Sequence, residues 1–216
     1  MRLKSLAAIS VIVACYSCNP TGPVYDPLPI LGNAVIDTQH VNGKQLIDTI
    51  YPQVPSFGLI DQMGNKLTEK KLDGKIYVAD FIFTTCTGIC PIMTTNMEVV
   101  HKAFKTDSNF CIVSHTVNPE GDSVPVLKAY ADTHFATYPN WYFVTGDKKL
   151  IYDLARENYL VSATVGDGGA EDFVHSQFFA LVDPNKHVRG LYDGTDSTQV
   201  LKLIADIKVL QRVFGH

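Results

Sequence analysis

Residues 75–97, KIYVADFIFTTCTGICPIMTTNM, form the stretch that decides the fold. Its first part is apolar, aromatic and β-branched, which predicts a buried strand. A short loop with Cys86 follows, and Pro91 suits the first turn of a helix, where its missing N–H costs nothing. We therefore predict a strand, a tight loop and a helix over about 91–105, with Cys90 at the helix N-terminus.

Two cysteines in this position favour one of two chemistries. The unpaired N–H groups and the positive dipole end of a helix stabilise a thiolate, so we expect Cys86 and Cys90 to have lowered pKa values. Two such thiolates one loop apart can hold a soft metal ion, or they can cycle between dithiol and disulfide. The spacing alone leaves both possibilities open.

The N-terminus has the features of an exported protein. A basic start is followed by an uncharged run at 5–14, which is too short to span a bilayer as a helix. Residues 12–15, IVAC, resemble a bacterial lipobox, whose cysteine, here Cys15, is lipidated and becomes the first mature residue; Cys18 is the alternative acceptor. We expect 1–14 to be a signal peptide and the body to lie outside the cytoplasm, with a plain secretion signal or a short anchor as the alternative.

Charge and cysteine usage exclude two classes of protein. The formal net charge is −4 at pH 7, and it becomes more negative once a signal peptide carrying Arg2 and Lys4 is removed. A nucleic-acid partner would require a basic surface, so we expect none. Of the five cysteines, two lie at the lipobox and two in the loop. The remaining Cys111 is expected to be a small buried core residue, so the chain is not a disulfide-stapled scaffold.

The remaining pattern predicts one domain at 34–216 after a proline-rich, extended tether at 15–33 that takes no part in the core. Asn42-Gly43 predicts an opening β-hairpin. Strands are expected over 57–64, 75–84, 110–117, 141–144, 177–182 and 187–192, and helices over 91–105, 123–135, 150–159 and 198–213. Strands that alternate with helices and end in a hairpin and a last helix predict a three-layer α/β domain with a mixed sheet.

Several motifs together resemble the Sco/SenC family. They are FTTCxxxCP at 83–91, VNPE at 117–120 with Asp122, WxFxTG at 141–146, and His175-Ser176 before a strand that ends in Asp183-Pro184. The resemblance implies a thioredoxin-like fold with a mixed central sheet, an N-terminal β-hairpin and a hairpin insertion. It also implies a membrane-tethered protein that delivers copper to the CuA site of cytochrome c oxidase.

The family binds copper through two cysteines and one histidine, which correspond here to Cys86, Cys90 and His175. This set suits Cu(I), which is soft and content with three ligands, and it can hold Cu(II) with a further ligand. A structural zinc site would require four protein ligands. Many family members carry Pro-Asp between the cysteines, where this chain has Thr87-Gly88, so the loop lacks a carboxylate near the metal.

Asp80 interrupts the apolar strand. If both faces of that strand are covered, the carboxylate is buried and its pKa is raised. Thioredoxins look similar here, because they carry a buried aspartate six residues before their first active-site cysteine, where it shuttles protons. Asp80 is therefore a candidate proton shuttle, with a purely structural role as the alternative. Met93 and Met97 are expected in the core and not as copper ligands.

Three functions remain open. The leading hypothesis is a lipid-anchored copper metallochaperone on the periplasmic side of a bacterial membrane, with the copper-site subunit of cytochrome c oxidase as partner. Other periplasmic copper carriers or thiol reductants are further candidate partners. The competing hypothesis is a thiol-disulfide oxidoreductase in which Cys86 attacks, Cys90 resolves and Asp80 moves the proton. A redox or copper sensor is the third.

Overall fold

The computed structural model describes residues 28–41, 44–162 and 176–215. Its strands are β1 (Val35–Val41), β2 (Lys44–Ile50), β3 (Gly58–Asp61), β4 (Lys66–Thr68), β5 (Ile76–Ile82), β6 (Phe110–Thr116), β7 (Trp141–Thr145), β8 (Phe178–Val182) and β9 (Val188–Asp193). Its helices are α1 (Cys90–Phe104), α2 (Val124–Thr133), α3 (Lys148–Asp153) and α4 (Ser197–Phe214), with a 3₁₀ turn η1 (Glu69–Leu72) and a π-helical turn η2 (Leu154–Asn158). The predicted order of strands and helices is confirmed, whereas β4 and η1 were not predicted.

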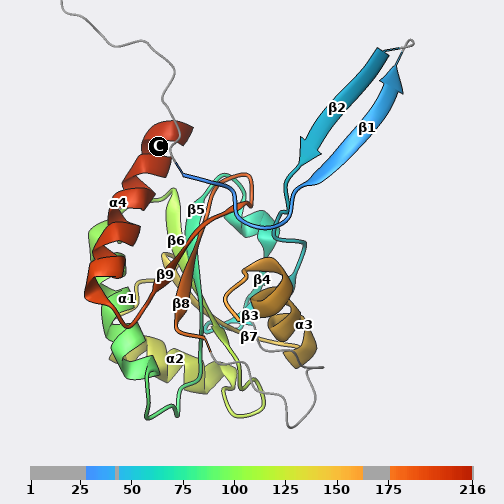
Figure 1. Cartoon of the computed structure of the whole chain (residues 1–216). Coiled ribbons are helices and arrows are strands. Elements are labelled where there is room, and N and C mark those ends of the chain that lie inside the picture. The colour runs from blue at the N-terminus through green and yellow to red at the C-terminus, as the bar shows by residue number, and fades with distance from the viewer. Residues whose placement is uncertain (1–27, 42–43, 163–175, 216) are drawn as a thin grey trace, which may run out of the picture.

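The centre of the molecule is a seven-stranded mixed sheet in the order β4-β3-β7-β6-β5-β8-β9. Strands β5, β6 and β7 run parallel, and the outer strands are antiparallel to their neighbours. The hairpin β1–β2 forms a separate two-stranded sheet that projects from the domain (Figure 1). The sequence pattern thus predicted both the mixed sheet and the hairpin correctly.

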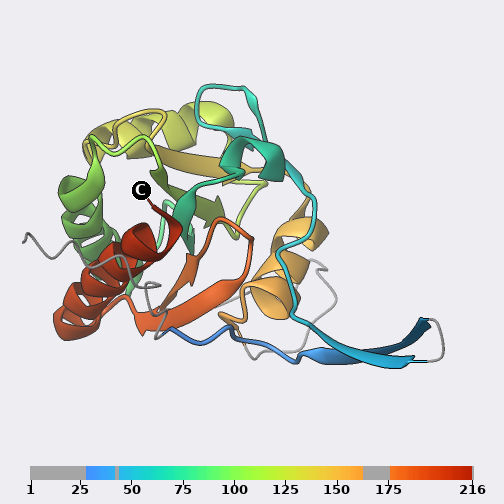
Figure 2. The same ribbon diagram turned by 90° about the horizontal axis from the view of Figure 1, so that it is seen from above.

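Helices cover both faces of the sheet, which makes three layers. Figure 2 shows α1 and α4 together on one side and α3 on the other, and α2 packs on the same side as α1 and α4. All of β5 is buried, as is typical of a parallel strand between two helical layers. Its side chains alternate, so Ile76, Val78 and Ile82 face α1 and α4, while Tyr77 and Phe81 face α3.

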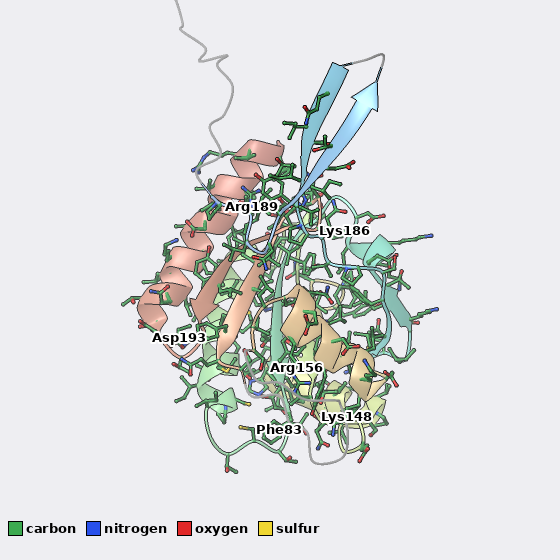
Figure 3. The ribbon with its side chains drawn as sticks, turned by 45° about the vertical axis from the view of Figure 1, so that its right-hand side comes forward. Phe83, Lys148, Arg156, Lys186, Arg189 and Asp193 are labelled. Carbon is green, nitrogen blue, oxygen red and sulfur yellow. The ribbon has the colours of Figure 1, made fainter. Side chains whose placement is uncertain are left out.

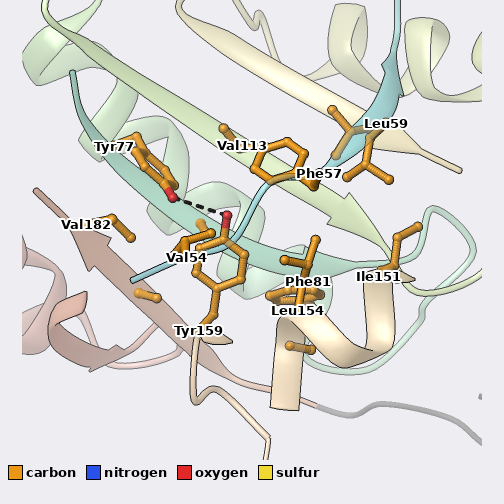
Figure 4. Close-up of a cluster of buried hydrophobic side chains, with 14 of the residues drawn as sticks. Val54, Phe57, Leu59, Tyr77, Phe81, Val113, Ile151, Leu154, Tyr159 and Val182 are labelled. Atoms are coloured by element: carbon orange, nitrogen blue, oxygen red, sulfur yellow. Dashed lines mark hydrogen bonds between the residues drawn. The ribbon is translucent and has the colours of Figure 1, made fainter. Parts of the chain in front are cut away.

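The α3 face holds a cluster of aromatic and aliphatic side chains, shown in Figure 4. Within it the hydroxyl groups of Tyr77 and Tyr159 form a hydrogen bond of 3.3 Å. One continuous helix was predicted over 150–159, but α3 gives way to the π-helical turn η2 at Leu154. The wider turn coincides with the burial of Leu154, Ala155 and Tyr159 against the sheet.

The N-terminal segment is bound to the domain at the end opposite the cysteine loop. The amide of Leu31 donates to the carbonyl of Val188 at 2.8 Å, and Arg189 Nε donates to the carbonyl of Pro29 at 3.1 Å. The end of the predicted tether therefore differs from expectation, because it packs on β9. Figure 3 shows Arg189 at this end of the molecule and Phe83, which precedes the cysteine loop, at the other.

Within the described ranges, none of the helices is both long and apolar enough to cross a membrane. The predicted signal peptide and both candidate lipidation sites, Cys15 and Cys18, lie outside the described residues, and so does His175.

Candidate functional site

The end of β5 and the start of α1 position the two cysteines. After Phe83 the chain turns, and the amide of Cys86 donates to the carbonyl of Phe83 at 3.2 Å. Helix α1 begins at Cys90 with a proline in its first turn, and Ile89 provides no side-chain cap. The first amides of the helix are therefore available to an acceptor in the loop.

The two thiols lie within hydrogen-bonding distance of one another but differ in environment. Burial alone would raise the pKa of Cys86, but hydrogen bonds from the Cys90 thiol and from the amides of Cys90, Gly88 and Ile89 outweigh it and lower the pKa. Cys90 is only 5% exposed, and burial, with the hydrogen bond to Cys86, raises its pKa to about 12. The prediction of two lowered pKa values is therefore correct for Cys86 and wrong for Cys90, because the helix terminus does not compensate for desolvation there.

A cavity of about 310 Å³ is lined by both cysteines. Besides the cysteines, it is lined by Phe81, Phe83, Gly88, Ile89, Val117 and Ser176. A second cavity, of about 330 Å³, is lined in part by Lys75, Lys105 and Asn140 and touches none of the predicted site residues. The chemistry therefore belongs to the first cavity, which places thiols in a largely apolar wall.

Asp80 lies on the α1 side of β5 and is 1% exposed. Burial raises its pKa to about 7, although the Ser114 hydroxyl is hydrogen-bonded to the carboxyl and lowers it. Ser114 Oγ in turn accepts from the indole N–H of Trp141 at 2.9 Å. Among the residues that the structure describes, the second oxygen, Asp80 Oδ1, has no hydrogen-bond partner. The negative charge of Asp80 contributes to the raised pKa of Cys90, so the two groups interact electrostatically. The predicted burial and raised pKa of Asp80 are confirmed, and its proton-shuttle role stays a prediction.

A buried histidine, His115, lies on the opposite face of the sheet from Asp80. Its ring stacks on Phe81 with 4.8 Å between centroids, and Nδ1 is 3.3 Å from the carbonyl oxygen of Asp80. Burial lowers its pKa to about 4, so the ring is neutral at physiological pH. Its Nε2 has no hydrogen-bond partner within the described part of the chain. No local sequence pattern predicts this environment, because it requires the stacking of side chains from two strands.

The structure brings together three of the four predicted site residues, namely Cys86, Cys90 and Asp80. His175 is outside the described residues, and in the described part of the chain no cluster of three or more His, Cys, Asp or Glu side chains could hold a metal ion. Met93, Met97 and Cys111 are fully buried, which confirms that they belong to the core.

Two polar contacts beside the cysteine loop had no role in the sequence-based prediction. Asp122 was noted only as part of a family motif, yet its carboxylate binds Thr84, two residues before Cys86. Ser114, which modifies the pKa of Asp80, lies in the buried strand β6. A buried polar residue in an otherwise apolar strand is the signal that identifies such a residue.

The chain matches a known protein family. A family model described as SCO1/SenC matches residues 50–211. Among solved structures, the chain is similar to a SCO1/SenC family lipoprotein from Bacillus anthracis, with 31% identity, a TM-score of 0.64, and coverage of 73% of this chain and 94% of that one.

Two further solved structures are similar to this chain. One is BsSco, a member of the Sco family of cytochrome c oxidase assembly proteins in which a disulfide switch was identified, with 33% identity, a TM-score of 0.63, and coverage of 74% and 93%. The other is Arabidopsis thaliana ScoI with copper bound, with 26% identity, a TM-score of 0.57, and coverage of 71% and 97%. Since the family model matches most of its length and Sco structures share its thioredoxin-like fold, this chain belongs to the SCO1/SenC family.

Proposed function

We propose that this chain binds copper through Cys86, Cys90 and His175 and serves the assembly of the CuA centre of cytochrome c oxidase. The observation that carries the proposal is the pair of hydrogen-bonded thiols at the edge of an apolar cavity, which Ser176, the residue that follows His175, also lines. Two thiolates and one imidazole suit Cu(I), and Cu(II) would require a further ligand. The copper bound in the Arabidopsis relative and the description of BsSco as an oxidase assembly protein support the assignment.

In this proposal copper is cargo, and its transfer proceeds by ligand exchange. Cys86 is the more accessible sulfur, so an incoming thiolate of the oxidase subunit displaces it before Cys90. Apolar contact is available beside the site, because Ile89, which lines the cavity, is 40% exposed and Ile92, in the first turn of α1, is 52% exposed. The same apolar contact would serve other periplasmic copper carriers or thiol reductants.

The test is a competition for Cu(I) between the reduced protein and a chromophoric chelator. We expect Cys86→Ser and Cys90→Ser to lose Cu(I) affinity by orders of magnitude, because a hydroxyl is a hard and weak ligand for this ion. His175→Ala should lower the affinity as well, whereas His134→Ala, which removes a histidine bound to Glu98, should not. Unchanged affinity in His175→Ala would remove this histidine from the site.

We propose a lipid anchor at Cys15, with Cys18 as the alternative, on the periplasmic side of a bacterial membrane. The lipobox-like sequence supports it, and so does the description of the Bacillus anthracis relative as a lipoprotein. Cys15→Ser should release the protein from the membrane fraction. Retention would assign the attachment to Cys18 or to an uncut anchor, and Cys18→Ser in the same background separates these two.

A second function, thiol-disulfide exchange, is favoured by the position of Asp80. The Cys86 thiolate attacks a target disulfide and releases one target thiolate; Asp80 then takes the proton of Cys90, whose sulfur attacks Cys86 and releases the second thiolate. The chain becomes a disulfide and the target is reduced by two electrons. Asp80→Asn should slow exchange with a model disulfide and abolish the inflection near pH 7 in its rate profile. An unchanged rate and profile would reject the shuttle.

A further inference from the structure

The loop between β6 and α2 contains a carboxylate that binds two separate strand ends. Asp122 is 1% exposed. It accepts from Thr84 Oγ1 at 2.6 Å, from the Thr84 amide at 3.2 Å and from Thr116 Oγ1 at 2.5 Å. All three donors are neutral, and a buried carboxylate is costly unless such hydrogen bonds satisfy it. Both oxygen atoms of Asp122 are therefore engaged in joining segments of the chain.

The two segments that Asp122 joins both lead to the cysteine site. Thr84 follows β5 by two residues and precedes Cys86 by two, and Thr116 is the last residue of β6. The amide of Val117 donates to the carbonyl of Ile82 at 2.8 Å, which extends the pairing of β5 and β6. The pairing therefore reaches the clamp, by which we mean the hydrogen bonds of Asp122 to Thr84 and Thr116. These bonds fix the backbone up to Thr84. The turn that carries Cys86 therefore starts from a residue whose position Asp122 restrains.

We propose that Asp122 is a positioning residue for the cysteine site: through Thr84 it holds the Cys86 sulfur close to the loop amides of Gly88 and Ile89 and to the Cys90 thiol at the start of α1. The Cys86 amide donates to the carbonyl of Phe83 at 3.2 Å, so the position of Cys86 depends on where the loop starts. Hydrogen bonds from the amides of Gly88, Ile89 and Cys90 lower the pKa of its thiol. Releasing Thr84 lets the turn relax and weakens those bonds. The Cys86 thiolate and a soft metal ion bound to it both lose stability.

This inference rests on the proposed function only where copper affinity is measured. The alkylation rate of Cys86 reports the position of the loop without copper. Asp122→Asn keeps the shape but presents an amide N–H₂ to groups that donate, and Thr84→Val removes one donor at equal volume. Thr84→Ser restores that donor. The matched control is Asp61→Asn, since Asp61 is also fully buried and accepts from the amides of Met63 and Asn65 in a turn that contains no cysteine.

The experiment compares three measurements on each variant: the rate of Cys86 alkylation at pH 7, the Cu(I) affinity in chelator competition, and the Tm. Loss of a group that orients a metal ligand costs about 10-fold to 100-fold in affinity. We expect about a 10-fold loss of affinity and a slower alkylation in Asp122→Asn and Thr84→Val, with recovery in Thr84→Ser. Asp61→Asn should lower the Tm and change neither the alkylation rate nor the affinity.

Two outcomes separate the positioning role of Asp122 from the proposed copper function. If Asp122→Asn and Thr84→Val lower only the Tm, as Asp61→Asn does, Asp122 is structural and the positioning role is overturned. If alkylation slows but the wild-type protein binds no copper, the positioning role stands and the copper function fails. Should Asp122→Asn not fold, Thr84→Val against Thr84→Ser alone decides, because Thr84 is partly exposed and its removal leaves the buried carboxylate with its other donors.

Discussion

The two ends of the central sheet each hold a thiol and a buried carboxylate, yet they differ in chemistry. At one end Cys111 lies near the start of β6, and Asp183 follows β8. Asp183 accepts from the amides of Asn185 and His187 and from Arg189 Nη1 at 2.8 Å. These bonds to Asp183 hold the β8–β9 turn in place.

The other end has Cys86, Cys90 and Asp80, and its groups are not fully satisfied. Asp80 Oδ1 has no hydrogen-bond partner in residues 28–41, 44–162 and 176–215, and burial raises the pKa of Asp80 to about 7. Hydrogen bonds lower the pKa of Cys86. Burial raises the pKa of Cys111 to about 12. Residue type therefore does not mark the functional end, since both ends carry a thiol and a buried carboxylate. A carboxylate with a raised pKa beside an accessible sulfur does.

The largest difference between the two ends is expected in thiol reactivity. At pH 8 a thiol with a pKa of about 12, such as Cys90 or Cys111, is about one part in 10⁴ thiolate. We expect iodoacetamide to alkylate Cys86 first in the folded, reduced protein, and Cys111 slower by more than about a thousandfold. Peptide mapping after timed quenching measures the order, and equal rates for Cys86 and Cys111 would contradict the comparison.

The next effect is a loss of stability when Asp183, at the end opposite the cysteine loop, is replaced. Asp183→Ala leaves the guanidinium of Arg189 buried without its carboxylate, and Arg189 is 4% exposed. Breaking a buried ion pair in this way costs about 3–5 kcal/mol. Urea denaturation should show that loss while the alkylation rate of Cys86 stays at the wild-type value. A changed Cys86 rate would mean that the two ends are coupled through the sheet.

The cysteine end could be predicted from sequence largely because its signals are local. The apolar run of β5, the proline in the first turn of α1 and the spacing of Cys86 and Cys90 lie within one short stretch. The burial of Asp80 followed from a strand covered on both faces. The short strand β4 was missed, because three residues carry no usable periodicity.

Properties that depend on distant contacts could not be predicted. The raised pKa of Cys90 results from the depth of its burial, which a helix-terminus argument does not contain. The environment of His115 requires ring stacking with Phe81 from the neighbouring strand. The clamp between Asp122 and Thr84 joins residues 38 positions apart, so nothing in either local sequence reveals it.

A stabilising effect, opposite in sign to that of Asp183→Ala, is expected at Asp80. Because the pKa of Asp80 is raised from 3.8 to about 7 in the folded state, the stability that it contributes is present below pH 3.8 and is lost as pH rises towards 7. Asp80→Asn lacks this loss, so it should gain on the wild type by up to about 1.4 kcal/mol per pH unit between these limits. Paired denaturation curves from pH 4 to 8 measure the difference.

His115 makes the paired design necessary. Its pKa is lowered from 6.5 to about 4, so its contribution to stability is lost as pH falls through that range, opposite in sign to the contribution of Asp80. The contributions of Asp80 and His115 partly cancel in the pH dependence of wild-type stability. The difference between Asp80→Asn and wild type at each pH removes the histidine term, and a flat difference would mean that Asp80 ionises normally.

The smallest loss of stability is expected from replacing Cys111, the thiol at the end opposite the cysteine loop. Cys111 is fully buried between apolar neighbours, and its sulfur is about the size of one methylene group. Cys111→Ala should therefore cost about 1 kcal/mol, whereas Cys111→Ser should cost more, about 1–3 kcal/mol, because it buries a hydroxyl without a designed partner. Neither variant should change the Cu(I) stoichiometry. If Cys111→Ala lowered copper binding as Cys86→Ser does, the metal site would not be confined to the cysteine loop.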